Sequence, residues 1–293
     1  MKKTFVILLL CLLSGVSLQA WNNIGHAAVA QIASNHLTKG TRKALKKYLK
    51  GTDIVEIASY PDRYYYQWTR DLGWECSNPA ILRRKGKALD DEPSNIEPWC
   101  HSYSVDSLFN TYRHNREGDA YVRNCIMDLD QIIRDIRENI DALSPYEQMK
   151  RIALVVHLVG DFHSPMHTLY VPAAPTGGKY SLWIDDEKIN IHSFWDSKIW
   201  RYLNPGWDYF DFAKNADTAT PAQIEEIVKG DIYDWGKASA IDAFPAHHLT
   251  GASEAQRHLG LDYPESLRPL VYNQLRNAGY RLAKLLNDLF DGR

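Results

Sequence analysis

One eleven-residue stretch constrains this chain most, because it places metal-binding side chains in a segment that otherwise reads as buried core. Residues 157–167 read His-Leu-Val-Gly-Asp-Phe-His-Ser-Pro-Met-His. His157 and Asp161 are four residues apart, so on a helix they lie one turn apart on the same face. Pro165 should end or kink that helix, so that His167 returns from a different direction. Buried polar groups are destabilising unless they are paired, and a transition metal is the obvious partner.

The same spacing occurs a second time, at His192 and Asp196. A single pair is a weak indication, because helices often carry His and Asp at this spacing as an ordinary solvated ion pair. Two pairs, together with His26, His101 and His167, favour a metal site much more strongly. Imidazole nitrogens and carboxylate oxygens are common zinc ligands, and catalytic zinc sites keep one position open for water.

His163 resembles a ligand but is interpreted differently. It lies four residues before His167, and on an unbroken helix the two rings would share a face. Pro165 stands between them and argues against that helix. We therefore expect His163 to be a histidine of the core or of the immediate surroundings of the site.

The first twenty residues have the pattern of a secretory signal peptide. Lys2 and Lys3 precede an apolar run from 5 to 13, and a small residue, Ala20, marks a cleavage position. The apolar run is too short to span a membrane. We expect cleavage after Ala20, a secreted or periplasmic protein whose mature chain begins at Trp21, and no stable membrane association.

The mature chain, residues 21–293, is expected to form one mainly α domain of many helices. Strand signals are weak, and residues 171–188 predict a loop or at most a short hairpin. Ser144-Pro-Tyr-Glu147 is a capping box that should begin the helix carrying His157. The other main helices are expected at 26–37, 41–49, 119–140, 221–243 and 265–290.

Charge and cysteine content set further limits. The formal net charge is −2, and removal of Lys2 and Lys3 takes it to −4. There is no basic stripe, which argues against tight nucleic-acid binding over a long footprint. An enzyme that holds one or two phosphates in a metal pocket remains possible. After cleavage Cys76, Cys100 and Cys125 remain, and a Cys76–Cys100 disulfide is about as strongly indicated as none.

The full set of spacings resembles the S-one/P-one nuclease family of zinc-dependent, single-strand-specific nucleases and 3′-nucleotidases. The resemblance spans the mature chain and extends to Asn124-Cys125 and to residues 278–287. It implies a fold of the zinc phospholipase C and single-strand nuclease type, and it implies three zinc ions. The implied ligands are Asp62, His101, His157 and Asp161 for the first ion, with Asp161 bridging to a second ion held by His26 and the main-chain amine and carbonyl of Trp21, and His167, His192 and Asp196 for the third.

The same resemblance implies a chemistry. Two close zinc ions would share a water of lowered pKa that attacks phosphorus, and the third would stabilise the departing 3′ oxygen. The implied substrates are single-stranded DNA or RNA, yielding 5′-phosphates, and 3′-nucleotides. The implied protein is a monomer. Asp62 and Asp161 are the expected catalytic carboxylates, together with Arg63. Because an α-amino group is a ligand, signal cleavage before Trp21 would itself complete the site.

Two positions depart from the family pattern. An aromatic residue usually follows the histidine equivalent to His101, but here Ser102 follows and Tyr103 comes one place later. The arginine usually found three residues after the Asp62 position is replaced by Tyr65, and Arg63 lies closer to Asp62. Either Arg63 and Tyr103 replace these contacts from shifted positions, or base selection and phosphate binding differ from the family pattern; Arg63 is the expected phosphate contact, and Tyr65 and Tyr103 are the candidate substrate contacts. The segment 76–98 either shapes the pocket rim, which we favour, or is a passive surface loop.

Two alternative functions remain open at this stage. A bacterial zinc phospholipase C shares the N-terminal Trp ligand and the central His-x-x-x-Asp spacing. Its last pair ends in Glu, whereas here the pair ends in Asp196, and here His26 lies only five residues after Trp21. A second alternative is an exported zinc-binding protein without catalytic activity, against which the complete set of ligands argues.

Overall fold

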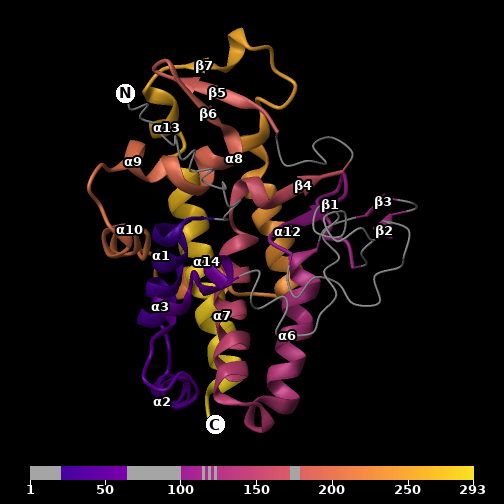
Figure 1. The fold of residues 1–293 in the computed structure, drawn as a ribbon, viewed down its shortest axis with the longest axis vertical. Helices are drawn as coiled ribbons and strands as arrows, with labels where there is room; N and C mark the ends of the chain where they lie inside the picture. Colours follow the sequence, from indigo (N-terminus) through magenta and orange to yellow (C-terminus); the bar gives the residue numbers. More distant parts are fainter. Residues whose placement is uncertain (1–20, 65–99, 114–115, 118–119, 122–123, 172–178) are drawn as a thin grey trace, which may run out of the picture.

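Helices make up most of the computed structural model, which describes residues 21–64, 100–113, 116–117, 120–121, 124–171 and 179–293 (Figure 1). The mainly α prediction is confirmed. The α-helices are α1 (Asn23–Asn35), α2 (Lys39–Tyr48), α3 (Ile54–Ile57), α6 (Cys125–Asn139), α7 (Pro145–Asp161), α8 (Ile191–Ser193), α9 (Ile199–Leu203), α10 (Tyr209–Ala216), α11 (Pro221–Ile227), α12 (Ile232–Ala243), α13 (Asp262–Ser266) and α14 (Arg268–Phe290).

Two long helices, α7 and α14, form the centre of the molecule. Helix α14 packs against α1, α10, α7 and α2, and α6 runs beside α7 (Figure 1). The last ten residues of α7, 152–161, are all buried. A helix buried on every side is normally apolar throughout, so the histidine and the aspartate at the end of α7 need polar or charged partners.

Several helix boundaries differ from those predicted. The helix expected from 119 begins at Cys125, because the Asn124 side chain caps it by accepting from the Met127 N–H at 3.1 Å. The helix expected over 221–243 is two helices, α11 and α12, separated at Gly230, whose φ is +82°. A left-handed residue of this kind ends a helix, and glycine adopts it without strain.

The predicted capping interaction of Ser144 at the start of α7 is confirmed. The Ser144 Oγ accepts from the Glu147 N–H at 3.3 Å, and Pro145 is the first helical residue. The helix ends at Asp161. Pro165 then opens a short 3₁₀ turn, η2 (Pro165–His167). The chain therefore leaves α7 before His167, as the position of the proline indicated.

The strands are short but more numerous than the single hairpin expected. They form three small sheets. In the first, β1 (Tyr103–Val105) pairs parallel with β4 (Thr168–Tyr170), and in the second, β2 (Arg116–Glu117) pairs antiparallel with β3 (Ala120–Tyr121). In the third, β5 (Ser181–Ile184) lies between β6 (Glu187–Asn190) and β7 (His258–Leu259). Strands of two to four residues give too little alternation for a sequence pattern to predict.

Some predictions concern residues outside the described part of the chain. These are the signal peptide, Tyr65, Cys76 and the rim segment 76–98. They stay predictions. Among the described residues, no helix is both long enough and apolar enough to cross a bilayer.

Candidate metal centre

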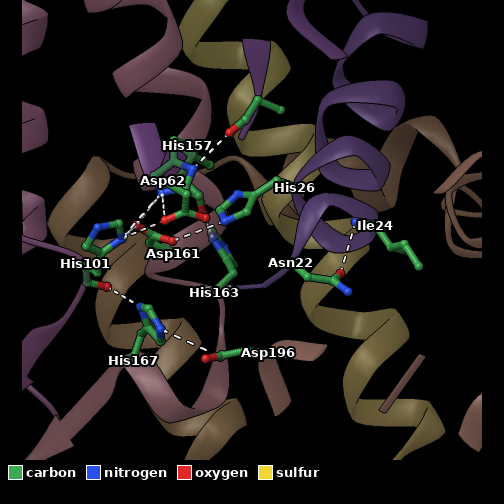
Figure 2. A network of polar contacts seen from close by, with 12 residues as sticks. Asn22, Ile24, His26, Asp62, His101, His157, Asp161, His163, His167 and Asp196 are labelled. Atoms are coloured by element: carbon green, nitrogen blue, oxygen red, sulfur yellow. Dashed lines mark hydrogen bonds and ion pairs between the residues drawn. The ribbon is translucent and has the colours of Figure 1, made fainter. Parts of the chain in front are cut away.

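Eight chemically suitable side chains gather at one end of α7 in three groups, two of which share His157. Within each group the candidate ligand atoms lie within 4.8 Å of one another. The His26 group consists of His26, His157 and Asp161, the Asp62 group of Asp62, His101 and His157, and the Asp196 group of His167, His192 and Asp196. Figure 2 shows the first two groups converging around His157, with His167 and Asp196 beside them. The structure thus brings together every side chain predicted as a metal ligand.

Helix α7 orients His157 through the main chain of a distant segment. The His157 Nδ1 lies 2.9 Å from the carbonyl oxygen of Ala58, so Nδ1–H is the donor. The Nε2 lone pair then faces the carboxylates, 3.4 Å from an oxygen of Asp62 and 3.4 Å from one of Asp161. A ligating histidine commonly has its other ring nitrogen held in this way, which selects the tautomer.

The two carboxylate oxygens of Asp161 face different neighbours. Oδ1 lies 3.4 Å from the Nε2 of His26. Oδ2 lies 2.9 Å from the Nδ1 of His101 and 3.4 Å from the Nε2 of His157. Asp161 therefore stands between the His26 group and the Asp62 group, with one oxygen directed to each.

His26 is held by close packing. Asn22 caps α1 by accepting from the Ile24 N–H at 3.0 Å, and His26 follows one turn later. Its ring stacks on that of His157 with centroids 4.0 Å apart and planes 20° apart. On α7, a Cβ added to Gly160 would come within 2.6 Å of the His26 Nδ1. Only glycine at that position leaves room for this ring.

The parallel pair β1–β4 brings His101 and His167 together. Each histidine lies just before its strand, and Tyr103 is paired in register with Thr168. The Nδ1–H of His167 donates to the carbonyl oxygen of His101. The Nε2 of His167 then points toward Asp196, whose Oδ1 is 3.8 Å away.

Asp196 lies in a widened helical turn. Helix α8 continues into a π-turn, η3 (Phe194–Lys198), and then into α9. The His192 Nε2 lies 3.2 Å from Asp196 Oδ2, and π-turns of this kind are frequent at functional sites. The carbonyl oxygen of Asp196 accepts from the Asn22 N–H at 2.7 Å, so Trp21 also lies at this centre. Trp21 is buried and packs edge-on against Trp200, with ring centroids 5.8 Å apart.

The ring nitrogens and carboxylate oxygens of the three groups suit a bound cation. Five buried atoms of these groups have no hydrogen-bond partner within the described ranges, namely His26 Nδ1, His26 Nε2, Asp161 Oδ1, His167 Nε2 and Asp196 Oδ1. Burial, and then the negative charges of Asp62 and Asp161, raise the pKa of Asp196 well above its usual value. A cation would supply the missing positive charge, and imidazole with carboxylate suits a transition metal.

In metal-free protein, protonated imidazole would compensate the negative charges of the buried carboxylates. Burial opposes the charge of His157, but Asp161 and Asp62 outweigh it and raise the pKa of His157 to about 9. Burial likewise opposes the charge of Asp161, but His157 and His101 hold its pKa well below the usual range. Metal ligation requires the opposite state of His157, so a bound metal would displace that proton.

His163 does not belong to the groups, and its interpretation as a core histidine is confirmed. Its Nδ1–H donates to the carbonyl oxygen of Val159 at 2.8 Å, and its Nε2 accepts from Arg281 at 2.8 Å. Both ring nitrogens of His163 are hydrogen-bonded, so neither is available to the three metal-ligand groups. Burial, and then the charge of Arg281, hold the pKa of His163 well below its usual value.

The predicted substrate contacts are placed differently. Tyr103 is buried, and its hydroxyl donates to the carbonyl oxygen of Gly236 at 2.9 Å, so the prediction that it contacts substrate is corrected. It points inward because β1 is covered on that side by Phe162. Arg63 is exposed, and its guanidinium lies 5.7 Å from the ring centre of Tyr60. Its contact with phosphate stays a prediction.

Sequence reasoning missed three supports of the site. Ala58 and His101 orient His157 and His167 through their main-chain carbonyls, which every residue has, so no sequence pattern reveals them. Gly160 did carry one, since a glycine inside an apolar helix often marks a close approach. Its position directly before Asp161 was the available clue.

Fold and site together define a mainly α protein with three adjacent groups able to bind metal. Residues 21–291 match the family described as S1/P1 Nuclease, and the chain belongs to that family. It is 23% identical to Endonuclease 1 of Arabidopsis thaliana, with 97% of this chain and 91% of the relative aligned. It is 24% identical to Nuclease S1 of Aspergillus oryzae, covering 91% of each chain. It is also 24% identical to Nuclease P1 of Penicillium citrinum, covering 92% of this chain and 97% of the relative.

Proposed function

We propose that this protein is a zinc-dependent nuclease that hydrolyses single-stranded DNA and RNA to 5′-phosphorylated products and removes phosphate from 3′-nucleotides. The observation that carries the proposal is the set of three ligand groups, two of which meet at Asp161. Membership of the nuclease family and the nuclease names of the relatives support the same reaction.

We assign three zinc ions to the three groups. One would be held by Asp62, His101, His157 and Asp161. A second would be held by His26, Asp161 and the main-chain amine and carbonyl of Trp21. The third would be held by His167, His192 and Asp196. The divergent oxygens of Asp161 support its role as a bridge.

Bound zinc ions would supply a water of lowered pKa and Lewis-acid stabilisation of phosphate oxygens. The protein's own contribution is orientation. Main-chain carbonyls hold His157 and His167 as Nδ1–H tautomers, so that each Nε2 lone pair faces the cluster. The side chains of His101 and His192 are each 20% exposed, whereas that of Asp161 is fully buried. A phosphate would therefore approach from the side of His101 and His192, where Arg63 is the proposed additional contact.

Removal of metal is the first test. Mature protein treated with a chelator and dialysed is expected to lose at least ~100-fold of its activity on single-stranded DNA and 3′-AMP, and added Zn²⁺ should restore it. Elemental analysis should find three zinc ions per chain before chelation. The melting temperature should fall on chelation, because ligands that bind only the folded state stabilise it.

Two outcomes would contradict the proposal. Full nuclease activity in protein holding less than one zinc per chain would exclude zinc dependence. Chelator-sensitive hydrolysis of phosphatidylcholine without nuclease activity would favour the phospholipase C alternative, and zinc binding without hydrolysis of any of these substrates would favour the non-catalytic alternative.

We propose that residues 1–20 are a signal peptide, that residues 21–293 form the nuclease domain, and that the mature protein is a secreted or periplasmic monomer. The position of Trp21 supports cleavage after Ala20. Its side chain is buried, and a Cβ added to Gly25 would come within 2.6 Å of the Trp21 Cβ. The residue after Trp21 contacts the metal centre, because the Asn22 N–H donates to the carbonyl oxygen of Asp196, and a mature chain beginning at Trp21 would place its α-amino group there.

The chain terminus provides a second test. An alanine added before Trp21 is expected to lower nuclease activity by at least ~100-fold and to reduce the zinc content by one ion, because an amide nitrogen cannot replace an amine ligand. The control is the same protein produced with a longer cleavable extension, from which a protease then releases Trp21. Full activity with a blocked terminus would refute the amine ligand.

A further inference from the structure

The three-stranded sheet carries a row of aromatic and basic side chains on its outer face. Trp183 of β5 is paired with Lys188 of β6 and with His258 of β7. The indole and imidazole rings stack with centroids 4.6 Å apart and planes 8° apart. The Nζ of Lys188 lies 5.0 Å from the centre of the indole ring. The three side chains form a continuous stack across the sheet, called here the Trp183 row.

The Trp183 row does not belong to the hydrophobic core. Leu182 and Ile184, the neighbours of Trp183 in β5, are buried, so they point into the protein. Lys188 and His258 are exposed, and Trp183 is half-buried. Alternation along the strands therefore places the row on the solvent side. An aromatic stack flanked by a cation on an open sheet face is a surface on which nucleobases stack.

The row lies on the approach to the Asp196 group. Strand β6 runs directly into α8, and Figure 1 shows the sheet next to that helix. Asn190 shares the face of Lys188, and its side chain accepts from the His192 N–H at 2.9 Å. At ~3.3 Å per residue, the four residues from Lys188 to His192 span at most about 13 Å. That span is at most about four stacked nucleotides at ~3.4 Å each.

The charges around the sheet favour a polyanion at the end nearer α8. The turn at the opposite end carries two exposed acids, Asp185 and Asp186. The next residue, Glu187, is paired with Arg201 and Lys198. Lys188 has no carboxylate partner within 4 Å among the described residues, so its charge is available to a phosphate. A backbone phosphate would therefore sit near Lys188 and Asn190 rather than near the turn.

We propose that the Trp183 row is a subsite that stacks a base of single-stranded nucleic acid a few nucleotides from the cleaved bond. Strand β7 is one edge of this sheet, so among the described residues no strand lies beside the face of His258 that points away from Trp183. A base adds to the stack on that face, and Lys188 binds the backbone. This inference rests on the proposed nuclease function, because it concerns the same substrate class.

The test compares a long and a short substrate. Trp183→Ala is expected to raise the KM for a twelve-nucleotide oligothymidylate about tenfold, with kcat changed less than twofold, because stacking holds bound substrate and not the reacting atoms. Hydrolysis of 3′-AMP, which cannot reach the row, should stay within twofold. Trp183→Phe keeps a stacking ring and should restore KM to within about threefold. Lys43→Ala, which removes an exposed cation from α2, is the matched control and should leave KM and kcat unchanged for both substrates.

A binding measurement separates this inference from the proposed function. Fluorescence anisotropy with a labelled phosphorothioate oligonucleotide reports affinity without hydrolysis, and Trp183→Ala should weaken it about tenfold. If wild-type protein binds the oligonucleotide in a Trp183-dependent manner but hydrolyses nothing, the nuclease proposal fails and the subsite stands. If Trp183→Ala leaves oligonucleotide KM and affinity unchanged, or worsens 3′-AMP hydrolysis equally, the subsite is refuted.

Discussion

Asp161→Asn is expected to reduce kcat/KM by at least ~10³-fold on both single-stranded DNA and 3′-AMP, the largest effect of any single substitution in this protein. Asp161 directs one oxygen to His26 and the other to His101 and His157. An amide keeps the shape but offers one weak oxygen ligand, so it cannot bridge two cations. Metals contribute several kcal/mol of transition-state stabilisation in such sites, which corresponds to this loss. Steady-state kinetics and elemental analysis measure the two consequences.

The zinc content of Asp161→Asn should fall by at least one ion per chain. Asp217→Asn is the matched control, since Asp217 has hydrogen-bond partners of its own in Asn35, His36 and Tyr280, outside the metal groups. The control should lose some thermal stability and keep its zinc and its activity. A fully metallated, active Asp161→Asn protein would rule out the bridging role.

Gly160→Ala is expected to lower activity by about 10- to 100-fold, the loss typical of displacing a residue that orients a ligand. In an ordinary helix interior this change would add about 1 kcal/mol of stability. Here the new Cβ would lie 2.6 Å from the His26 Nδ1, and the ring is confined by its stack on His157. Overpacking a buried site costs about 1–3 kcal/mol, so the two effects together should leave the protein no more stable. Kinetics, zinc content and a thermal melt test this prediction.

The matched control for Gly160→Ala is Gly40→Ala. Gly40 is also helical, but a Cβ there would meet the carboxylate of Asp291, an exposed side chain that can move away, and would lie in ordinary contact, 3.4 Å, with the main-chain nitrogen of Gly292. That variant should gain stability and keep full activity. If Gly160→Ala keeps its activity and zinc content and gains the same stability as the control, the packing of His26 against α7 does not position it.

The sequence by itself determined the ligand residues and the helix at the heart of the site. His157 and Asp161 face the same way because of the period of 3.6 residues, a local property. Ser144 and Pro165 mark where that helix begins and where the chain must leave it. These features depend on residues within one or two turns of each other, so a linear pattern contains them.

Only the tertiary structure decided how these pieces meet. The carbonyl of Ala58 orients a ring ninety-nine residues away, and the pairing of β1 with β4 aligns His101 with His167. The burial of Tyr103 overturned a substrate contact that its position in the sequence suggested. The outward row around Trp183 likewise exists only once three strands are in register. Packing between distant segments sets such contacts, and no local periodicity records them.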